Sequence, residues 1–399
     1  MPLRRDPGAP RPPAEHVYRG GRVLDVETGT VGPPVDIRTR DGVIEEIAAS
    51  LPTGRDAVEV PLDGLTVLPG LIDSHVHVTQ ASGDFQEILS WPPSYHAART
   101  EHVLHAMLRR GFTTVRDMGG ADTGLPRAVE ERLITGPQVK AGGPIFAPTG
   151  GHVLTQVCDG EVELRRAMRA QFRDGADHIK MTLSGGVISK MRIEALAFSD
   201  AEVEAAVDEA RLAQRYIAAH VYTAEAVARA LRLGVRTIEH GNLLDQECIE
   251  LFLERNAYYV PTLATFWAIL SGTTGHGLDA AKRAAVEEIF ERGLESLAQA
   301  SAAGVRIGYG TDLHGDGIPL QLEEFTLRAR VQDPLAIIQS ATTTGAEIIG
   351  ETNRLGKIQE GYQADLIAVD GNPLENLDVL ATGKALRYVI TAGEPLTVN

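Results

Sequence analysis

Cysteine is scarce in this sequence: Cys158 and Cys248 are the only two among 399 residues. Two cysteines do not build a disulfide framework, so we expect a reducing, cytoplasmic setting. Long apolar segments are also missing, because no segment approaches the roughly 18 consecutive apolar residues of a membrane-spanning helix. Residues 1–16 are Pro-rich without the apolar core of a signal peptide, and we expect them to form a flexible arm.

Basic residues are outnumbered by acidic ones. Lys and Arg total 38 against 54 Asp and Glu, which gives a formal net charge of −16 at pH 7. Affinity for nucleic acid or for an anionic membrane depends on clustered positive charge, so we expect neither as a partner. With 43% hydrophobic and 23% charged residues, the composition is that of a globular protein. A chain of this length accommodates two or three domains, or one large α/β barrel with a smaller appendage.

The two ends of the chain share a pattern of short β-prone runs separated by turn residues. Asp41 and Gly42, between two such runs, predict a hairpin turn. We therefore predict a small β-sandwich domain assembled from residues 17–68 and 356–399. Its predicted strands include Arg22–Val26, Val35–Thr39, Val43–Ile47, Ala57–Val60, Leu366–Val369 and Leu386–Thr391.

The middle of the chain, residues 69–355, alternates apolar β-prone runs with helical stretches. One helix start is marked by Ser199 and Glu202, which are spaced as in a capping box. Alternating strands and helices predict a parallel sheet, and eight such runs favour an α/β fold of the (β/α)8 TIM-barrel type. A doubly wound open sheet is the competing architecture. The eight predicted strands are Leu71–His77, Thr113–Asp117, Gln138–Ala141, His178–Thr182, Ile217–Val221, Thr237–His240, Tyr258–Pro261 and Arg306–Asp312.

Histidines lie at the ends of several predicted strands. His75 and His77 are two positions apart, so on a strand both imidazoles point to the same side. His220 and His240 each end a later strand, and the carboxylate of Asp312 ends the last one. In a barrel the carboxyl ends of all strands meet at one face. Four imidazoles and a carboxylate would then form a ligand set for zinc or a similar divalent ion, whereas each histidine alone fits an ordinary hydrogen-bonded role.

Lys180 lies in an apolar predicted strand, where burying an unpaired ammonium is costly. If burial and neighbouring cations lower its pKa, the free amine can add CO2 and become a carbamate. The carbamate is an anionic group whose two oxygens can bridge two metals. The residues alone leave open a lysine whose ammonium reaches the surface, or one that pairs with Asp174 or Asp177.

Several segments together resemble the metal-dependent amidohydrolase superfamily. The resemblance spans roughly residues 17–389 and points to the branch of carboxylated-lysine dipeptidases, prolidase-like enzymes and ochratoxinase-like amidases, also described as imidazolonepropionase-like. The matching segments are Leu68–His77, Ala176–Lys180 with Ser184–Val187, Ala219–Ala224, Ile238–Gly241, Tyr309–Asp312 and Gly361–Leu366.

This resemblance implies two divalent metal ions, which we expect to be zinc. The implied ligands are His75, His77, the carbamate of Lys180 and Asp312 for one ion, and the same carbamate with His220 and His240 for the other. Lys140, which lies near the end of the third predicted strand, is a rival for the carbamate. Lys180 is preferred because it lies in the matching motif, one strand before His220.

The resemblance also implies a hydrolase that cleaves amide bonds of dipeptides or N-acyl amino acids through a metal-bridging hydroxide. Asp312 would act as general base and return the proton to the leaving nitrogen. His152 matches a substrate-contacting histidine, and Tyr222 matches a tyrosine that contacts the substrate's carboxylate or carbonyl. A plain loop histidine and a packed tyrosine are the alternatives. Residues 189–196 depart from the branch, where a loop containing Pro and Asp is expected, so the substrate stays open.

Two other functions are compatible with the pattern. One is a mononuclear cyclic-amide hydrolase or deaminase of the imidazolonepropionase type, which metal stoichiometry would separate from a binuclear enzyme. The other is a non-enzymatic scaffold, which is disfavoured because such relatives usually lose ligands and this chain keeps all six. We expect a homo-oligomer that acts on a small-molecule amide.

Overall fold

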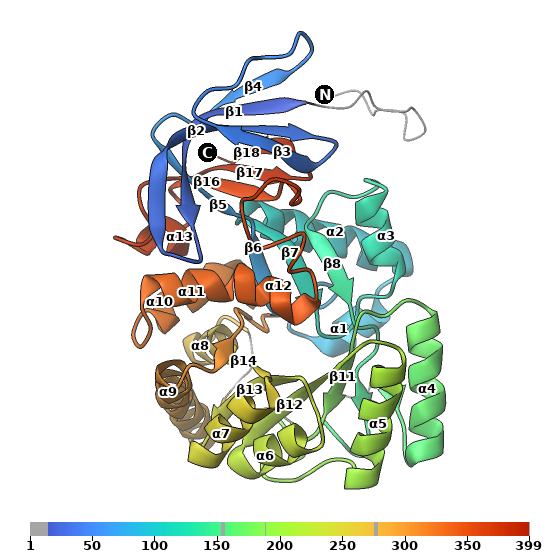
Figure 1. The fold of residues 1–399 in the computed structure, drawn as a ribbon. Helices are drawn as coiled ribbons and strands as arrows, with labels where there is room; N and C mark the ends of the chain where they lie inside the picture. Colours follow the sequence, from blue (N-terminus) through green and yellow to red (C-terminus); the bar gives the residue numbers. More distant parts are fainter. Residues whose placement is uncertain (1–14, 153–155, 188, 275–277, 399) are drawn as a thin grey trace.

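The computed structural model describes residues 15–152, 156–187, 189–274 and 278–398. Residues 1–14 of the predicted arm lie outside them, and the first strand already begins at His16. The described chain is a mixed α/β fold: helices flank parallel strands, and a further sheet lies at one end of the molecule (Figure 1). No helix in the described part of the chain is long and apolar enough to cross a membrane.

The sheet at one end of the molecule combines strands from both ends of the chain. In spatial order its strands are β18 (Glu394–Thr397), β17 (Leu386–Thr391), β16 (Leu366–Asp370), β5 (Leu65–Pro69), β1 (His16–Asp25), β2 (Thr30–Arg40) and β3 (Val43–Ala48), with β4 (Val58–Pro61) paired to β1. Asp41 and Gly42 join β2 to β3 with φ angles of 52° and 81°. Two left-handed residues are what a two-residue hairpin needs, and the hairpin predicted here is present.

The middle of the chain forms two parallel sheets. The smaller one consists of β6 (Leu71–Val76), β7 (Phe112–Asp117) and β8 (Gln138–Ala141). The larger one consists, in spatial order, of β10 (Gln156–Val157), β9 (Phe146–Ala147), β11 (Ile179–Thr182), β12 (Ile217–Thr223), β13 (Thr237–Leu243), β14 (Tyr258–Val260) and β15 (Arg306–Ile307). Strands β6, β7 and β11 are buried along their whole length, as parallel strands covered by helices are expected to be.

Backbone hydrogen bonds connect the two parallel sheets in two places. The Ser74 N–H of β6 donates to the carbonyl of Tyr309, just after β15, over 2.7 Å. The Asp177 N–H, just before β11, donates to the carbonyl of Ala141 in β8 over 2.9 Å. The small sheet is therefore joined to both the β11 side and the β15 side of the large one, which brings the end of β6 toward the segment that follows β15.

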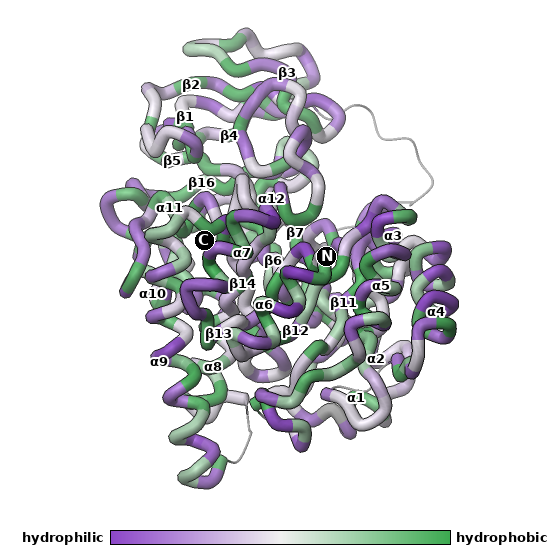
Figure 2. The backbone as a smooth tube through the Cα atoms, turned by 60° about the horizontal axis from the view of Figure 1, so that its bottom comes forward, coloured by the Kyte–Doolittle hydropathy of each residue, from purple (hydrophilic) through white to green (hydrophobic). Residues whose placement is uncertain are grey.

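Helices cover the parallel strands, and most of them bury one face. They are α1 (Phe85–Ser90), α2 (Pro93–Arg109), α3 (Gly124–Glu130), α4 (Glu161–Arg173), α5 (Asp200–Leu212), α6 (Ala224–Arg232), α7 (Gln246–Arg255), α8 (Leu263–Ser271), α9 (Ala280–Ala302), the 3-10 helix η1 (Gly315–Leu322), α10 (Glu323–Arg328), α11 (Pro334–Ser340), α12 (Thr343–Ile349) and α13 (Asp378–Ala381). The outer helix α4 is mainly hydrophilic in Figure 2, yet its residues Leu164 and Met168 are buried. Ser199 and Glu202 form the predicted capping box of α5.

The last predicted strand is shorter than expected. A strand was expected over Arg306–Asp312, but β15 covers only Arg306–Ile307. The N–H groups of Thr311 and Asp312 both donate to the carbonyl of His75, over 3.2 and 2.8 Å, and Asp312 has a left-handed φ of 52°. Successive N–H groups of a strand point in opposite directions, so a strand could not make both bonds. A tight turn, rather than a strand end, therefore positions Asp312.

Candidate metal centre

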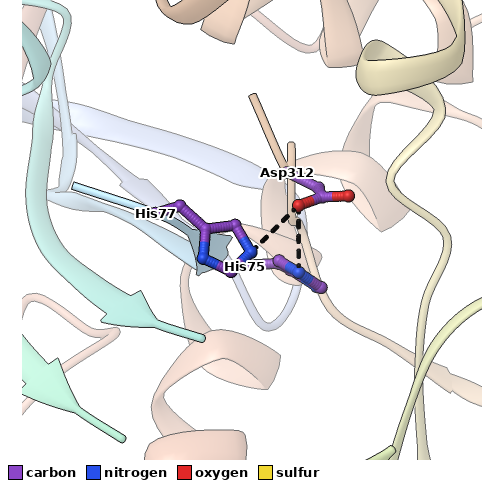
Figure 3. A group of neighbouring side chains, drawn as sticks. All are labelled: His75, His77 and Asp312. Carbon is purple, nitrogen blue, oxygen red and sulfur yellow. Dashed lines mark ion pairs between the residues drawn. The ribbon is translucent and has the colours of Figure 1, made fainter. Parts of the chain in front are cut away.

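Two imidazoles and a carboxylate meet where β6 ends (Figure 3). His75 belongs to β6, His77 follows it, and Asp312 comes from the turn after β15. Asp312 Oδ1 lies 3.3 Å from His75 Nε2 and 3.2 Å from His77 Nε2. One ligand atom from each residue can be chosen so that all three lie within 4.8 Å of one another. The structure thus brings together three of the residues predicted to bind metal.

In each imidazole, the hydrogen bond at Nδ1 fixes which ring nitrogen carries the proton. His77 Nδ1 lies 2.8 Å from the carbonyl oxygen of Gly119, which only accepts, so Nδ1 carries the proton. His75 Nδ1 lies 2.8 Å from the carboxylate oxygen Glu239 Oε2 and donates in the same way. In the neutral rings, each Nε2 therefore turns a lone pair toward an oxygen of Asp312. Two lone pairs beside an anionic oxygen repel one another unless a cation or a proton lies among them, so this donor set fits a divalent metal.

In this cluster the carboxylate and the imidazoles shift one another's pKa values. Burial alone would raise the pKa of Asp312, but His75 and His77 hold it well below its usual range. Burial lowers the pKa of His77, yet the hydrogen bond and charge of Asp312 outweigh it and raise that pKa above its ordinary value, so without a cation a proton on Nε2 is favoured. Asp312 is therefore an anion at neutral pH, the form in which a carboxylate binds metal.

A second pair of imidazoles lies beside the first. His220 on β12 and His240 on β13 have ring centroids 4.5 Å apart, and the His240 ring lies 5.2 Å from that of His75. The carbonyl of Gly185 lies 3.2 Å from His220 Nε2, so this nitrogen donates and Nδ1 keeps the lone pair. His240 Nδ1 lies 2.8 Å from Thr262 Oγ1. Burial is the largest influence on the pKa values of His220 and His240 and lowers both. Neighbouring imidazoles lower them further and the carboxylate of Asp312 raises them, but the net pKa values lie well below the ordinary one. Both rings are neutral, as ligands must be.

Among the predicted ligands, Lys180 on β11 is the one that must be modified to a carbamate before it can bind metal. Its side chain is buried, with 3% exposure, so the ammonium does not reach the surface. Burial lowers the pKa of Lys180 to about 8, although Glu239 and Asp312 act in the opposite direction. The rival Lys140 instead pairs with Glu351, with 2.5 Å between Nζ and Oε1, and lines a different cavity of about 690 Å³ next to the end sheet. Of the two lysines, Lys180 is the one near the histidines.

His152 and Tyr222 both lie against the second imidazole pair. The His152 ring stacks on His220 at 4.5 Å, and burial lowers the pKa of His152 to about 4, so the ring is neutral at pH 7. The Tyr222 ring stacks on His240 at 5.3 Å with an interplanar angle of 11°. Burial raises the pKa of Tyr222 well above its usual value, so the hydroxyl remains a hydrogen-bond donor. Both residues are next to the candidate metal centre, where they were predicted.

Other residues of the centre were not predicted. Glu239 and Arg116 form a fully buried ion pair behind His75, with 2.8 Å between Glu239 Oε1 and Arg116 Nη2. Burial alone would raise the pKa of Glu239, but Arg116 and His75 hold it far below the ordinary value. In the sequence, the only indication of Glu239 was a charged residue inside the predicted strand that also carries the candidate ligand His240. The ring centroid of His314, two residues after Asp312, lies 5.6 Å from that of His77.

The loop after β11 contacts the second histidine pair through the carbonyl of Gly185. Ser184 makes an isolated β-bridge with Leu196, which folds the loop back on itself. Arg192 Nε lies 3.2 Å from Glu194 Oε2, and both side chains are more than half exposed. This charge pair within residues 189–196 faces solvent.

Comparison with known proteins identifies the family of this chain. A sequence model of the Amidohydrolase family matches residues 66–396. Ochratoxinase of Aspergillus niger is 31% identical over 361 residues, covering 82% of this chain and 75% of the relative. A crystal structure of a prolidase complexed with N-methylphosphonate-L-proline superimposes with a TM-score of 0.91 at 38% identity, covering 96% of this chain and all of the other. A crystal structure of a Xaa-Pro dipeptidase with bound methionine gives a TM-score of 0.85 at 29% identity, covering the same shares of the two chains.

The chain belongs to the amidohydrolase family, in the branch that contains ochratoxinase and prolidase-like enzymes. It is a hydrolase that acts on amide bonds. Members of this family generally use metal ions, and the cluster of His75, His77 and Asp312 is a candidate site for one.

Proposed function

We propose that the protein is a binuclear metal-dependent hydrolase that cleaves the amide bond of dipeptides or N-acyl amino acids. The two parallel sheets would form one closed (β/α)8 barrel, residues 69–355, with the metals at the carboxyl ends of its strands. Residues 17–68 and 356–399 would form the small β-sandwich domain. We further propose a cytoplasmic homo-oligomer whose partner is a small-molecule amide, rather than a nucleic acid or a membrane.

One observation carries this proposal. The Nε2 lone pairs of His75 and His77 face the same oxygen of Asp312, at 3.3 and 3.2 Å, in a buried site. Hydrogen bonds at Nδ1 of each ring exclude the alternative in which that nitrogen carries the lone pair. Only a cation or a shared proton makes this arrangement favourable, and two neutral imidazoles with a carboxylate are ligands typical of zinc.

The carbamate of Lys180 would join this site to the second one. The free amine nitrogen would bond to the carbon of CO2 and release one proton, which leaves an anionic group with two oxygens. One oxygen would complete the first site and the other would complete the pair of His220 and His240. Burial of the lysine supports this role, because an uncharged amine is the form that both burial and CO2 addition favour.

The two ions would supply an acidified water between them and would polarise the amide carbonyl. Asp312 would hold the proton released from the nucleophile and pass it to the leaving nitrogen, which leaves poorly unless it is protonated. Tyr222 would donate its hydroxyl hydrogen bond to the substrate's carbonyl or carboxylate. His152, neutral at pH 7, would stabilise the oxyanion by donating a ring N–H.

The substrate class is supported by the relatives. Relatives named ochratoxinase, prolidase and Xaa-Pro dipeptidase cover most of this chain, with 26–38% identity. The test is a screen of dipeptides and N-acyl amino acids with protein stripped by a chelator and then reloaded with Zn²⁺ or Mn²⁺ and bicarbonate. We expect the stripped protein to be inactive and the reloaded protein to hydrolyse part of the set. Full activity after complete removal of metal would contradict the proposal.

The modified lysine has its own test. Lys180→Ala should bind less metal and lose activity, and a short carboxylate such as formate or acetate should restore part of both, because it can occupy the place of the carbamate. Full activity of Lys180→Ala without an added carboxylate would eliminate the carbamate.

A mononuclear hydrolase or deaminase of cyclic amides is the second candidate. It is favoured by one observation: His75, His77 and Asp312 form a three-ligand site without any modification of Lys180. Metal analysis separates the two, because two ions per chain support the binuclear enzyme and one ion supports the alternative.

A further inference from the structure

Buried polar side chains form a closed hydrogen-bonded circuit behind His75. Arg116 on β7 and Glu239 on β13 have fully buried side chains, and Arg116 Nη2 donates to Glu239 Oε1 over 2.8 Å. Arg116 Nη1 donates to Thr237 Oγ1 over 3.1 Å, and Thr237 Oγ1 donates to Glu239 Oε1 over 2.6 Å. Arg116 Nε donates to the carbonyl of Ser74 over 2.5 Å. Glu239 Oε2 receives the Nδ1–H of His75 over 2.8 Å.

The donors and acceptors in this circuit leave a single consistent assignment. A guanidinium only donates, so Thr237 accepts from Arg116 and must give its own proton to Glu239. Glu239 Oε1 then has two donors, and Oε2 is left for His75. An ionised carboxylate only accepts, so His75 must carry its proton on Nδ1. The lone pair of His75 is therefore on Nε2, the nitrogen that faces Asp312.

A contribution to folding stability does not by itself explain this buried circuit. Fully buried ion pairs often contribute little or nothing to stability relative to apolar side chains of similar volume. This pair spans two strands and ends on an imidazole that belongs to the candidate metal centre. A carboxylate that accepts the distal N–H of a histidine is the arrangement that orients histidine ligands and raises their basicity.

We propose that Glu239, held in place by Arg116 and Thr237, is a positioning residue that keeps His75 in the tautomer able to bind metal. This inference rests on the metal site of the proposed function. Glu239 does not touch the substrate in this proposal; it acts only through His75. The hydrogen bonds from Arg116 and Thr237 to Oε1 prevent the carboxylate from turning away.

Glu239→Gln is the variant that tests the tautomer. If the amide oxygen stays with Arg116 and Thr237, the amide NH2 faces His75 Nδ1 and forces the proton onto Nε2, where it blocks the metal. We expect binding of Zn²⁺ to the first site to weaken about 10–100-fold, the usual range for loss of such a partner. The measurement is competition for Zn²⁺ with a chelator, together with the absorption bands of the Co²⁺-loaded protein, which report the ligand set. Circular dichroism and the melting temperature check the fold.

A second substitution distinguishes positioning from a structural role. In Arg116→Met combined with Glu239→Gln, the amide is free to rotate and to present its oxygen to His75, with its NH2 toward Thr237. We expect this double variant to bind Zn²⁺ more tightly than Glu239→Gln alone. A structural role predicts the reverse, because the double variant has lost more of the circuit.

Glu324→Gln is the matched control. Glu324 is also fully buried, lies one helical turn from the buried Arg328, and accepts from the N–H of Ala264 over 2.7 Å without contacting an imidazole. We expect it to keep the Zn²⁺ affinity and the Co²⁺ spectrum of the unmodified protein.

His77→Ala separates failure of this inference from failure of the proposed site. If His77→Ala leaves Zn²⁺ binding unchanged, the proposed metal site is wrong. If His77→Ala loses Zn²⁺ while Glu239→Gln keeps both the affinity and the spectrum, only the role of Glu239 is overturned. The same conclusion follows if the double variant binds Zn²⁺ more weakly than Glu239→Gln.

Discussion

A single hydroxyl, that of Thr262, fixes the orientation of His240. Thr262 Oγ1 lies 2.8 Å from His240 Nδ1, and both residues have left-handed backbones, with φ angles of 50° and 73°. A β-branched residue rarely adopts such an angle, because its side chain crowds the backbone. Strain of this kind is retained where the surrounding structure needs the side chain in one place, and it is concentrated at functional sites.

This geometry predicts opposite results for two substitutions of Thr262. Thr262→Val keeps the shape but removes the hydrogen bond, and we expect the ion that His240 is proposed to hold to bind about tenfold more weakly. Thr262→Ser keeps the hydroxyl and removes the branch, so metal binding should be retained. Metal content after dialysis against graded chelator measures both. Equal loss of metal in the two variants would show that the hydroxyl is not what matters.

Tyr222 gives a prediction that concerns the reaction rather than the metal. Its hydroxyl stays protonated because burial raises its pKa well above the usual value. Tyr222→Phe should lower kcat/KM about 10²–10³-fold, the cost of removing one hydrogen-bond donor to a developing oxyanion. The pH profile between about pH 6 and 9 should keep its shape, because the lost group does not titrate there. Unchanged kcat/KM in the metal-loaded variant would mean that Tyr222 only packs against His240.

At the level of residues, the sequence singles out the histidines of the candidate centre but not the residues that hold them in place. His75, His77, His220 and His240 stand out because strand periodicity and strand ends are local patterns. Glu239 does not stand out, although it precedes His240, because its partner Arg116 is 123 positions away. A contact of that separation depends on which strands are opposite each other, and no local pattern encodes it.

Helix α5 provides a test at the level of one element. Ser199 Oγ accepts from the Glu202 N–H over 3.3 Å, and Glu202 Oε2 accepts from the Ser199 N–H over 2.7 Å. Ser199→Ala removes one of these bonds and should lower the free energy of unfolding by about 1 kcal/mol. Urea unfolding measures it. Glu204→Ala, at an exposed position of the same helix, is the control and should be nearly neutral. If the two variants have equal stability, the cap contributes nothing.

The elements themselves were predicted where their signals are local. The capping box, the hairpin at Asp41 and Gly42, and most of the parallel strands agree with the structure to within a few residues. The exception is Arg306–Asp312, where an apolar run was interpreted as one strand. Its second half instead turns so that two N–H groups share the carbonyl of His75. That turn is imposed by a strand more than 200 positions earlier, so the run alone could not reveal it.

At the scale of the whole molecule, one acidic residue lies where the end sheet meets the parallel strands. Asp365 immediately precedes β16, and its carbonyl accepts from the N–H of Gly70, just before β6, over 2.8 Å. Its Oδ1 accepts from the Ala392 N–H over 2.7 Å. The side chain is buried, and this burial raises the pKa of Asp365 to about 6. The sequence does not predict these contacts of Asp365, because segments from the two ends of the chain come together only once the sheet has formed.

This raised pKa predicts how stability changes with pH. The folded protein binds the Asp365 proton more tightly than the unfolded chain does, where the pKa is about 3.9. The stabilisation from this group is therefore complete below about pH 4 and is lost as the pH rises through about 6, with a total change of up to about 3 kcal/mol. Asp365→Asn carries no charge in either state and has no such slope. The stability of Asp365→Asn relative to the unmodified protein should therefore increase between pH 4 and 7 in parallel urea titrations. Other titrating groups cancel in this difference, including the histidines of the candidate metal centre. Parallel pH profiles for the two proteins would therefore refute a raised pKa at Asp365.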